Sequence, residues 1–320
     1  MINGRVSGGI AAFVVLTALG CSGAGPTNEP IDESVSQADQ ALRPGRDASN
    51  RPEILLFPGS DGAIHRLTTA GRDEGVLAQV TNRGTLSGIA LDRFGNVYVS
   101  NWGDGTIHAY TAAGGDLGVF ASTGLSVTYA LALDHQGNLF VAEGDNAIHK
   151  FSADGEPLGL AASLMGLGCP AGVAFDRSDN LFVSDICGSV IRKYSPTGEY
   201  LGIFAASGLS NPGALAFDDR GNLFVANTDN GGPFRNTVRK FSATGADLGS
   251  FASAGLHFPS GLAFNARGEL LVSNGEQEPD STAYSIHRFS AKGESLGALA
   301  VLPFAAEGLV VAAPTRGCGH

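Results

Sequence analysis

The chain has 320 residues, of which 46 are glycine and only 16% are charged. This composition is typical of many short strands joined by tight turns, and one all-β domain of this size is ordinary. Acidic side chains outnumber basic ones by 31 to 20, giving a formal charge of −11, and no run of lysine or arginine stands out. The charge argues against a nucleic-acid partner and favours cationic ligands or metal ions.

The first twenty residues have the pattern of a signal peptide. Arg5 precedes an apolar stretch over 10–19, and Gly20-Cys21 supplies a cleavage site after a small residue. The apolar stretch is shorter than the roughly 20 residues that a membrane-spanning helix needs. We therefore expect residues 1–20 to be a signal peptide and the protein to be exported.

The end of this segment, Thr17-Ala18-Leu19-Gly20-Cys21, resembles a bacterial lipobox, with Ala18 where the pattern usually has leucine. The resemblance implies that acyl chains on Cys21 anchor the protein to a bacterial membrane in the cell envelope, since each buried methylene contributes about 0.8 kcal/mol. Secretion or release into the periplasm without this anchor is the alternative. Residues 21–52 contain few large apolar side chains, so we expect them to form a disordered tether.

A repeated pattern begins after the tether. Its clearest copies are GIALDRFGNVYVSN from Gly88, ALALDHQGNLFVAE from Ala130, GVAFDRSDNLFVSD from Gly172, ALAFDDRGNLFVAN from Ala214 and GLAFNARGELLVSN from Gly261. Aligned on their Asp or Asn at 92, 134, 176, 218 and 265, the copies are spaced by 42, 42, 42 and 47 residues. This period is the length of one propeller blade.

Each copy continues with an alternating strand such as AIHKF from Ala147, a turn such as SADGEP and a final strand such as LGLAAS. The alternation of apolar and polar residues, bounded by Gly, Asp and Asn, predicts four strands per repeat. Gly or Asn in the first turn suits a positive φ. Each repeat is therefore predicted to be a four-stranded antiparallel sheet.

The two ends of the repeat region complete each other. Residues 53–57 (EILLF) match the second strand of a repeat, and residues 308–312 (GLVVA) match the first. Five complete repeats and one split repeat predict an all-β, six-bladed β-propeller over 53–313, monomeric, with a tail over 314–320. Closure by pairing the two ends protects sheet edges that would otherwise pair with other chains.

These repeats resemble the NHL family, whose motif runs roughly P-x-G-[IVL]-A-[VLF]-D-x-x-G-N-[IVL]-[YFW]-V-[AS]-[DN]. Residues 210–227 (SNPGALAFDDRGNLFVAN) and 169–185 (CPAGVAFDRSDNLFVSD) carry the motif most fully, and the resemblance extends over about 53–313. NHL propellers serve as protein-binding, RNA-binding and enzymatic scaffolds. The resemblance therefore implies a fold and leaves the function open.

One face of the predicted propeller carries the connections between second and third strands, and we call it the variable-loop face. This connection is short in VSDICGSVI, longer over 225–238 and longest over 272–286, whereas the turns of the opposite face are nearly uniform. Because loops carry function on rigid scaffolds, we place the site here. Trp102, Asp229 and His257 are its candidate ligand-binding residues; packing for Trp102 and a structural role for His257 are the alternatives.

Oxygen-bearing side chains end the second strand of five repeats: Asn101, Glu143, Asp185, Asn227 and Asn274, with Pro58 in the split blade. If they converge near the central channel, they would suit Ca²⁺, which takes six to eight oxygen ligands. Further acidic residues at 104, 145, 229, 276, 278 and 280 would make the rim acidic. The alternative, which we favour, is that each side chain bonds to its own turn and ends its strand.

A more distant resemblance is to six-bladed calcium lactonases and phosphotriesterases of the gluconolactonase and paraoxonase type, which hold a central ion with Glu, Asn and Asp from different blades. Glu143, Asn227 and Asp185 match in residue type. The resemblance implies an ion that polarises a lactone or ester carbonyl, with Asp185 or Glu143 as the catalytic base. No phosphate loop, HExxH helix or GxSxG elbow is present.

Our leading hypothesis is a module that binds a ligand or an envelope protein through the variable-loop face without catalysis. The alternative is a calcium-dependent hydrolase of the lactonase or esterase type. The histidines do not favour a metal centre, because those at 65, 108, 149 and 287 occupy one register of the third strand in different blades. We expect them to point outward, away from any common ion.

Two cysteines of one repeat are predicted to form a disulfide. Cys169 precedes the first strand and Cys187 follows the second. In a hairpin that turns at about 178–179, the residue numbers of opposite positions sum to about 357. The numbers of these two cysteines sum to 356, so they should lie almost opposite each other. Export permits oxidation, and the bond would contribute roughly 3 kcal/mol. Two buried thiols are the alternative, and Cys318 has no assigned role.

Overall fold

The structure is a computed structural model that describes residues 52–80, 85–102, 104–122, 128–144, 146–161, 167–228, 236–275 and 284–312. The described residues all belong to one compact unit, Asp47–His320. The predicted signal peptide, Cys21, the tether, Cys318 and the acids at 145, 229, 276, 278 and 280 lie outside them. In the described ranges we find no helix whose length and apolar character would let it cross a bilayer.

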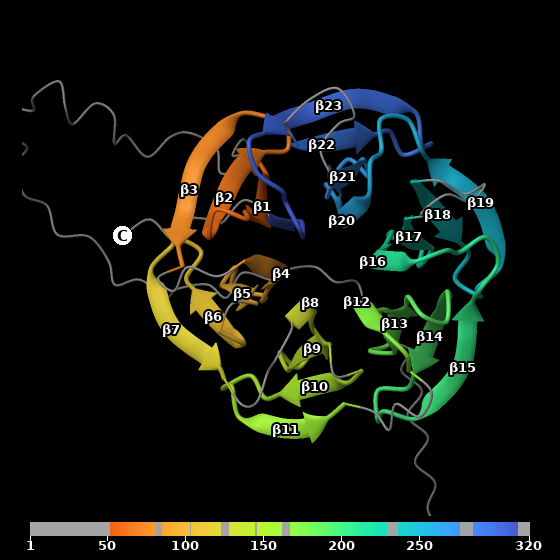
Figure 1. Ribbon diagram of the computed structural model, residues 1–320, viewed down its shortest axis with the longest axis horizontal. Coiled ribbons are helices and arrows are strands. Elements are labelled where there is room, and N and C mark those ends of the chain that lie inside the picture. Colours follow the sequence, from red (N-terminus) through yellow and green to blue (C-terminus); the bar gives the residue numbers. More distant parts are fainter. Residues whose placement is uncertain are drawn as a thin grey trace, which may run out of the picture. The chain divides into compact units, whose positions relative to one another are not determined.

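The described residues form six four-stranded antiparallel sheets arranged as blades around a centre, as predicted (Figure 1). The first blade contains β24 (Val310–Ala312), β1 (Ile54–Pro58), β2 (Ala63–Thr68) and β3 (Asp73–Gln79). The second contains β4 (Leu86–Leu91), β5 (Val97–Asn101), β6 (Thr106–Tyr110) and β7 (Asp116–Ala121). The third contains β8 (Thr128–Leu133), β9 (Leu139–Glu143), β10 (Ile148–Phe151) and β11 (Pro157–Leu160).

The remaining three blades follow in chain order. The fourth contains β12 (Pro170–Phe175), β13 (Leu181–Asp185), β14 (Val190–Tyr194) and β15 (Tyr200–Ala205). The fifth contains β16 (Pro212–Phe217), β17 (Leu223–Asn227), β18 (Thr237–Phe241) and β19 (Asp247–Ala252). The sixth contains β20 (Pro259–Phe264), β21 (Leu270–Asn274), β22 (Tyr284–Phe289) and β23 (Ser295–Leu302).

The ring closes by strand pairing between its two ends, which confirms the predicted closure. β24 pairs with β1 in antiparallel register, with Ile54 opposite Ala312 and Leu56 opposite Val310. Leu55 and Leu309 are buried in one cluster with Leu271 of the sixth blade. The last strand therefore supplies both the missing pairing and part of the core between the first and sixth blades.

The core lies between blades, and the second strands contribute most to it. All five residues of β5, β9, β13, β17 and β21 are buried, because neighbouring blades cover both faces of these strands. Phe182 of β13 stands edge-on to Phe217 of the next blade, with ring centroids 4.9 Å apart. Such pairs add about 0.5–1.5 kcal/mol beyond their buried area. The aromatic position of the repeat motif is therefore a packing position.

The repeated D-x-x-G-N segment is a turn held by its own side chains. The Asp92 carboxylate accepts bonds from the amides of Phe94 and Asn96 at 2.8 Å each, and the Asn96 side chain donates to the same carboxylate at 2.8 Å. Gly95 has φ of 82°, which suits glycine. The turns at Asp134, Asp176 and Asp218 repeat these bonds. The acid of the motif is thus structural.

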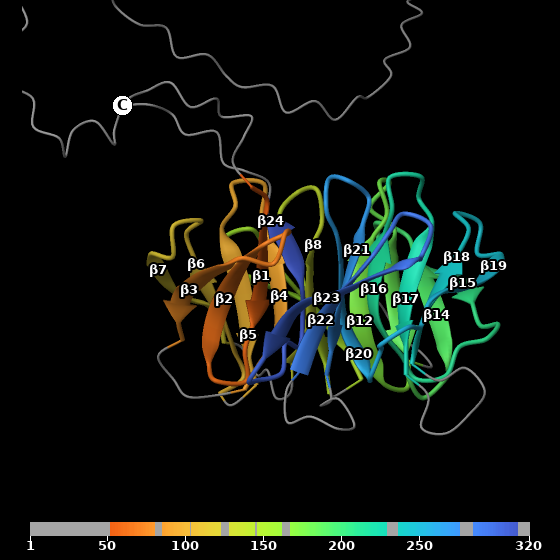
Figure 2. The ribbon, with the colours of Figure 1, turned by 90° about the horizontal axis from the view of Figure 1, so that it is seen from above.

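The chain enters and leaves the described propeller on one face (Figure 2). β1 begins at Ile54 beside the end of β24 at Ala312, and the Glu53 carboxylate accepts a bond from the Ala266 amide, in a first turn of the sixth blade. Both ends therefore lie with the uniform turns. The variable-loop face is the opposite one.

Candidate functional site

The predicted ring of oxygen-bearing side chains lies at the variable-loop end of the second strands. Asn101, Glu143, Asp185, Asn227 and Asn274 all have an exposed fraction of 0%. Each is therefore enclosed by protein.

In the split blade the strand register corrects the prediction by one residue. Phe57 pairs with His65 as Val99 pairs with His108, so Gly59, and not Pro58, holds the position of Asn101. A Cβ on Gly59 would collide with the Asp61 carboxylate. That carboxylate bonds the His65 ring at 3.0 Å.

Three members of the ring bond in the same way to the loop that enters their own blade. The Asp185 carboxylate accepts from the Gly168 amide at 3.2 Å. The Asn227 amide oxygen accepts from the Ser210 amide at 2.7 Å, and that of Asn274 from the His257 amide at 3.0 Å. In each case the donor lies 17 residues upstream. These bonds tie the end of the second strand to the segment before the first.

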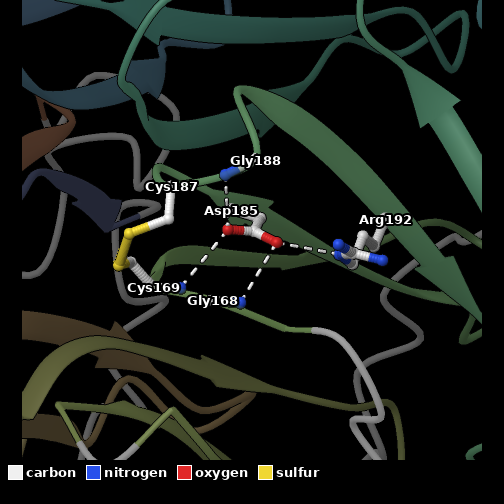
Figure 3. The surroundings of a disulfide bond; sticks show 6 residues. All are labelled: Gly168, Cys169, Asp185, Cys187, Gly188 and Arg192. Carbon is white, nitrogen blue, oxygen red and sulfur yellow. Dashed lines mark hydrogen bonds and ion pairs between the residues drawn. A yellow bond between two sulfur atoms is a disulfide. The ribbon is translucent and has the colours of Figure 1, made fainter.

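The Asp185 carboxylate accepts bonds from several donors (Figure 3). Besides Gly168, its carboxylate accepts from the amides of Cys169 at 3.3 Å and Gly188 at 3.0 Å and from Arg192 Nε at 2.9 Å. Burial alone would raise the pKa of Asp185, but the bonds from Gly188, Arg192, Gly168 and Cys169 outweigh it and lower the pKa below its usual value. The carboxylate is thus held ionised inside its own blade.

The predicted disulfide between Cys169 and Cys187 is confirmed, with Cα atoms 5.3 Å apart. It joins the loop that enters β12 to the loop that leaves β13, next to the Asp185 carboxylate (Figure 3). The bond and the carboxylate therefore fix the same two loops of the variable-loop face.

The other two ring members also bond within their blades. The Asn101 side chain donates to the Asp104 carboxylate at 3.0 Å, and Glu143 Oε2 lies 3.2 Å from Nε2 of His149. In the part of the chain that the structure describes, no group of three or more His, Cys, Asp or Glu is placed to hold a metal ion. The calcium site, and Glu143 or Asp185 as a catalytic base, stay predictions; ion binding would compete with these bonds.

The third strands carry a ring of basic residues. His65, His108, His149 and His287 occupy one register, as expected. Sequence analysis missed that Arg192 and Arg239 take the same position in the fourth and fifth blades, although VIRKY and TVRKF align with IHKF.

Two members of this basic ring support the loops that enter their blades. A Cβ on Gly208 would meet the Arg239 guanidinium, and one on Gly255 would meet the His287 ring. The basic ring thus supports the loops of the variable-loop face from beneath.

Of the predicted ligand-binding residues, Trp102 is exposed on the variable-loop face. Trp102 has an exposed fraction of 49%, while its backbone amide donates to the Thr85 carbonyl at 2.9 Å. His257 is partly buried next to Phe258, which is 37% exposed and has φ of 52°. Asp229 lies outside the described residues. Trp102 and Phe258 therefore offer apolar contact area to a partner.

The centre of the propeller holds a cavity of about 120 Å³ lined by the innermost strands of five blades and by residues 307–309, which precede β24 in the first blade. Among its lining residues, Glu307 alone is charged, and Tyr129, 49% exposed, is its largest polar side chain. Ala306 forms a bridge with Gly59, and Thr128 pairs with Glu143. Glu307 and Tyr129 therefore lie near the variable-loop end of the channel.

Sequence analysis also missed Glu307. Aligning EGLVVA with the first strands of the other blades puts Glu307 at the position of Ser87, Tyr129, Ala171, Gly213 and Ser260. That alignment was the available signal, because Tyr129, Ala171 and Ser260 at the same position also line the channel. Burial raises the pKa of the Glu307 carboxyl above its usual value.

Comparison with known proteins shows the fold. No family model and no curated protein matches the chain. A chain of a nidogen/laminin complex is 18% identical over 82% of this chain and 99% of its own, with a TM-score of 0.66. A Bacteroides caccae protein of unknown function is 17% identical over 82% and 99%, with a TM-score of 0.62. A gluconolactonase from Xanthomonas campestris is 21% identical over 81% and 91%, with a TM-score of 0.58.

At these identities the likeness extends to the β-propeller fold alone. Membership of the NHL family stays a prediction. The three neighbours include a propeller from a protein complex and an enzyme, so the fold by itself does not separate the binding and hydrolase hypotheses.

Proposed function

We propose that this protein is an exported binding module that recognises a ligand or an envelope protein through its variable-loop face, without catalysis. One observation carries the proposal. The side chains that an ion-dependent hydrolase would need, such as Asp185 and Asn227, are fully buried in bonds to their own blades. The described part of the face exposes aromatic surface at Trp102 and at Tyr129, and Tyr129 also lines the channel.

The proposed anchor at Cys21 fits this use of the fold. Because β1 begins on the face of uniform turns, a tether over 21–52 would join the propeller there (Figure 2). The variable-loop face would then point away from the attachment point. A partner in the cell envelope could reach it without passing the membrane surface.

Site-specific photo-crosslinking tests the proposal. A photoreactive residue is placed at Trp102 on the variable-loop face or, as a matched control, at Phe94, which is 68% exposed on the opposite face. Both variants are expressed in the producing cells and irradiated. We expect a discrete crosslinked partner from position 102 and none from position 94. Equal patterns from both positions, or no product from position 102, would contradict the proposal.

A calcium-dependent lactonase is the second candidate, favoured by the structural likeness to a gluconolactonase. It requires the Glu143 and Asp185 carboxylates to leave their present partners and bind an ion. Calcium titration by calorimetry tests this, with Glu143→Gln as the control variant. Binding that is lost in the variant, together with lactone or ester hydrolysis, would replace the binding proposal with the hydrolase.

A further inference from the structure

We propose that the variable-loop end of the central channel is a binding site for a primary ammonium group, held by the Glu307 carboxylate against the ring of Tyr129. The proposal rests on the proposed function and names the chemistry that the face recognises. The ammonium group could belong to a lysine side chain of a partner or to a free alkylamine.

The channel has room for such a group. Its cavity of about 120 Å³ far exceeds the ~10–15 Å³ that one water needs. Glycine lets the innermost strands of adjacent blades pack closely around this space: a Cβ on Gly172 would collide with the Gly213 carbonyl of the next blade, and one on Gly88 would press on Leu131. The cavity therefore has room for an ammonium group and part of its alkyl stem.

Within the described residues, Glu307 differs from Glu143 and Asp185 of the ring because no ion-pair partner contacts it. Glu143 pairs with His149 and Asp185 with Arg192, each within one blade. In the blade of Glu307 the corresponding base, His65, is already paired with Asp61. Among the described residues, no basic side chain forms an ion pair with Glu307. The ring of basic residues on the third strands therefore supplies no counter-ion to the Glu307 carboxylate in the channel.

The surroundings of the Glu307 carboxyl disfavour its charged form. Burial raises the pKa of Glu307, so the folded chain holds its anion at a free-energy cost that glutamine would avoid. Titratable groups kept in such surroundings within a cavity are functional candidates. A bound cation would offset the cost.

The donor set suits an ammonium ion better than a divalent metal. Ca²⁺ takes six to eight oxygen ligands, whereas the channel lining offers one carboxylate, Tyr129 and Ser260 among mostly glycine, alanine and aliphatic residues. The Ser260 hydroxyl bonds the Ala306 carbonyl at 3.1 Å and lies 3.1 Å from the Ser273 hydroxyl, so it can still accept one further bond. The half-exposed Tyr129 lines the same cavity as Glu307, and the face of an aromatic ring attracts a cation.

Titration of the mature protein with n-butylamine, followed by calorimetry or NMR shifts, tests the site. The neutral probe n-butanol has nearly the same shape. We expect the amine to bind with a Kd of about 1 mM, typical of a fragment, and the alcohol not to bind. Glu307→Gln should weaken amine binding by at least about tenfold, and Tyr129→Leu by roughly threefold.

A matched acid controls for net charge. Asp219→Asn removes a fully exposed carboxylate on the opposite face and should leave amine binding unchanged. The urea midpoint of each variant shows whether it is folded. Four results would each overturn the proposal. The amine could bind Glu307→Gln as tightly as the parent, or Asp219→Asn could lose as much amine affinity as Glu307→Gln. Butanol could bind as tightly as the amine, or the amine could fail to bind at about 10 mM.

A lysine-containing tripeptide with blocked ends distinguishes the two sources of the ammonium group. Peptide binding at least as tight as that of butylamine identifies a partner's lysine; binding of butylamine alone identifies a small amine. The amine titration needs no partner protein. If the amine does not bind, the ammonium site is refuted, and crosslinking from Trp102 still tests the binding function separately. Crosslinking can likewise fail while the amine still binds.

Discussion

Replacing Asp185 with asparagine tests whether this residue acts as a structural tie. The asparagine oxygen can still accept the Cys169 and Gly188 amides, which share one carboxylate oxygen. Its NH₂ group then faces the Gly168 amide and Arg192 Nε, which lose their acceptor. An unsatisfied buried donor costs about 1–3 kcal/mol. We therefore expect the free energy of unfolding at pH 7 to fall by about 2–5 kcal/mol.

The effect should depend on pH in a defined direction. Because the folded-state pKa of Asp185 lies below the ordinary value of 3.8, its contribution is complete only above about pH 5 and is lost as the pH falls through the folded pKa. Parent and variant should therefore converge in strongly acidic buffer.

Urea unfolding at constant m-value measures the difference, with Asp219→Asn as the exposed control. We expect no measurable change in the control, because an exposed ion pair is screened by solvent. A loss below about 0.5 kcal/mol in Asp185→Asn, or a loss as large at pH 2 as at pH 7, would refute the reasoning.

Three further outcomes are expected. Replacing Cys169 and Cys187 with serine opens a loop of 18 residues and should lower stability by about 3 kcal/mol, a Tm shift of roughly 6–12 °C by calorimetry; an unchanged Tm would refute it. Glu307→Gln should raise the urea midpoint at pH 7 but not at pH 3, since a raised folded-state pKa penalises the anion; a lower midpoint at pH 7 would contradict this. Phe241→Ala in the core should cost about 3–5 kcal/mol, and a urea midpoint like that of the parent would be inconsistent with its burial.

The blades could be predicted because every level of the pattern agrees. The 42-residue period, the strand alternation and the turn chemistry at Asp92 all point to one four-stranded unit. The error at Pro58 arose where that agreement stops, since the split blade has no D-x-x-G-N turn to set its register. An alignment error of one residue exchanges the two faces of a strand. The sequence therefore did not show that Gly59 holds this position, or that the Asp61 carboxylate occupies the space where a Gly59 side chain would lie.

The site could be predicted only in part. Position alone identified the ends of the second strands, but the direction of a side chain there depends on the loop that enters the blade, 17 residues upstream. Local sequence does not show whether a backbone amide of that loop will meet the carboxylate. The disulfide could be placed because both cysteines lie in one hairpin, where pairing follows from the turn.

The split blade is where the ring departs most from its own repeat, and this departure has a physical basis. Five blades draw their first and second strands from one hairpin, so the turn between them constrains both. In the first blade β24 and β1 come from opposite ends of the chain. Glu307 precedes β24 in a segment free of that turn, and the base of its blade is already occupied by Asp61. Six carboxylates at this position would repel one another around one channel. The repeat instead leaves the position variable, with Ser87, Tyr129, Ala171, Gly213 and Ser260 in the other blades, so Glu307 is the single charge among the lining residues.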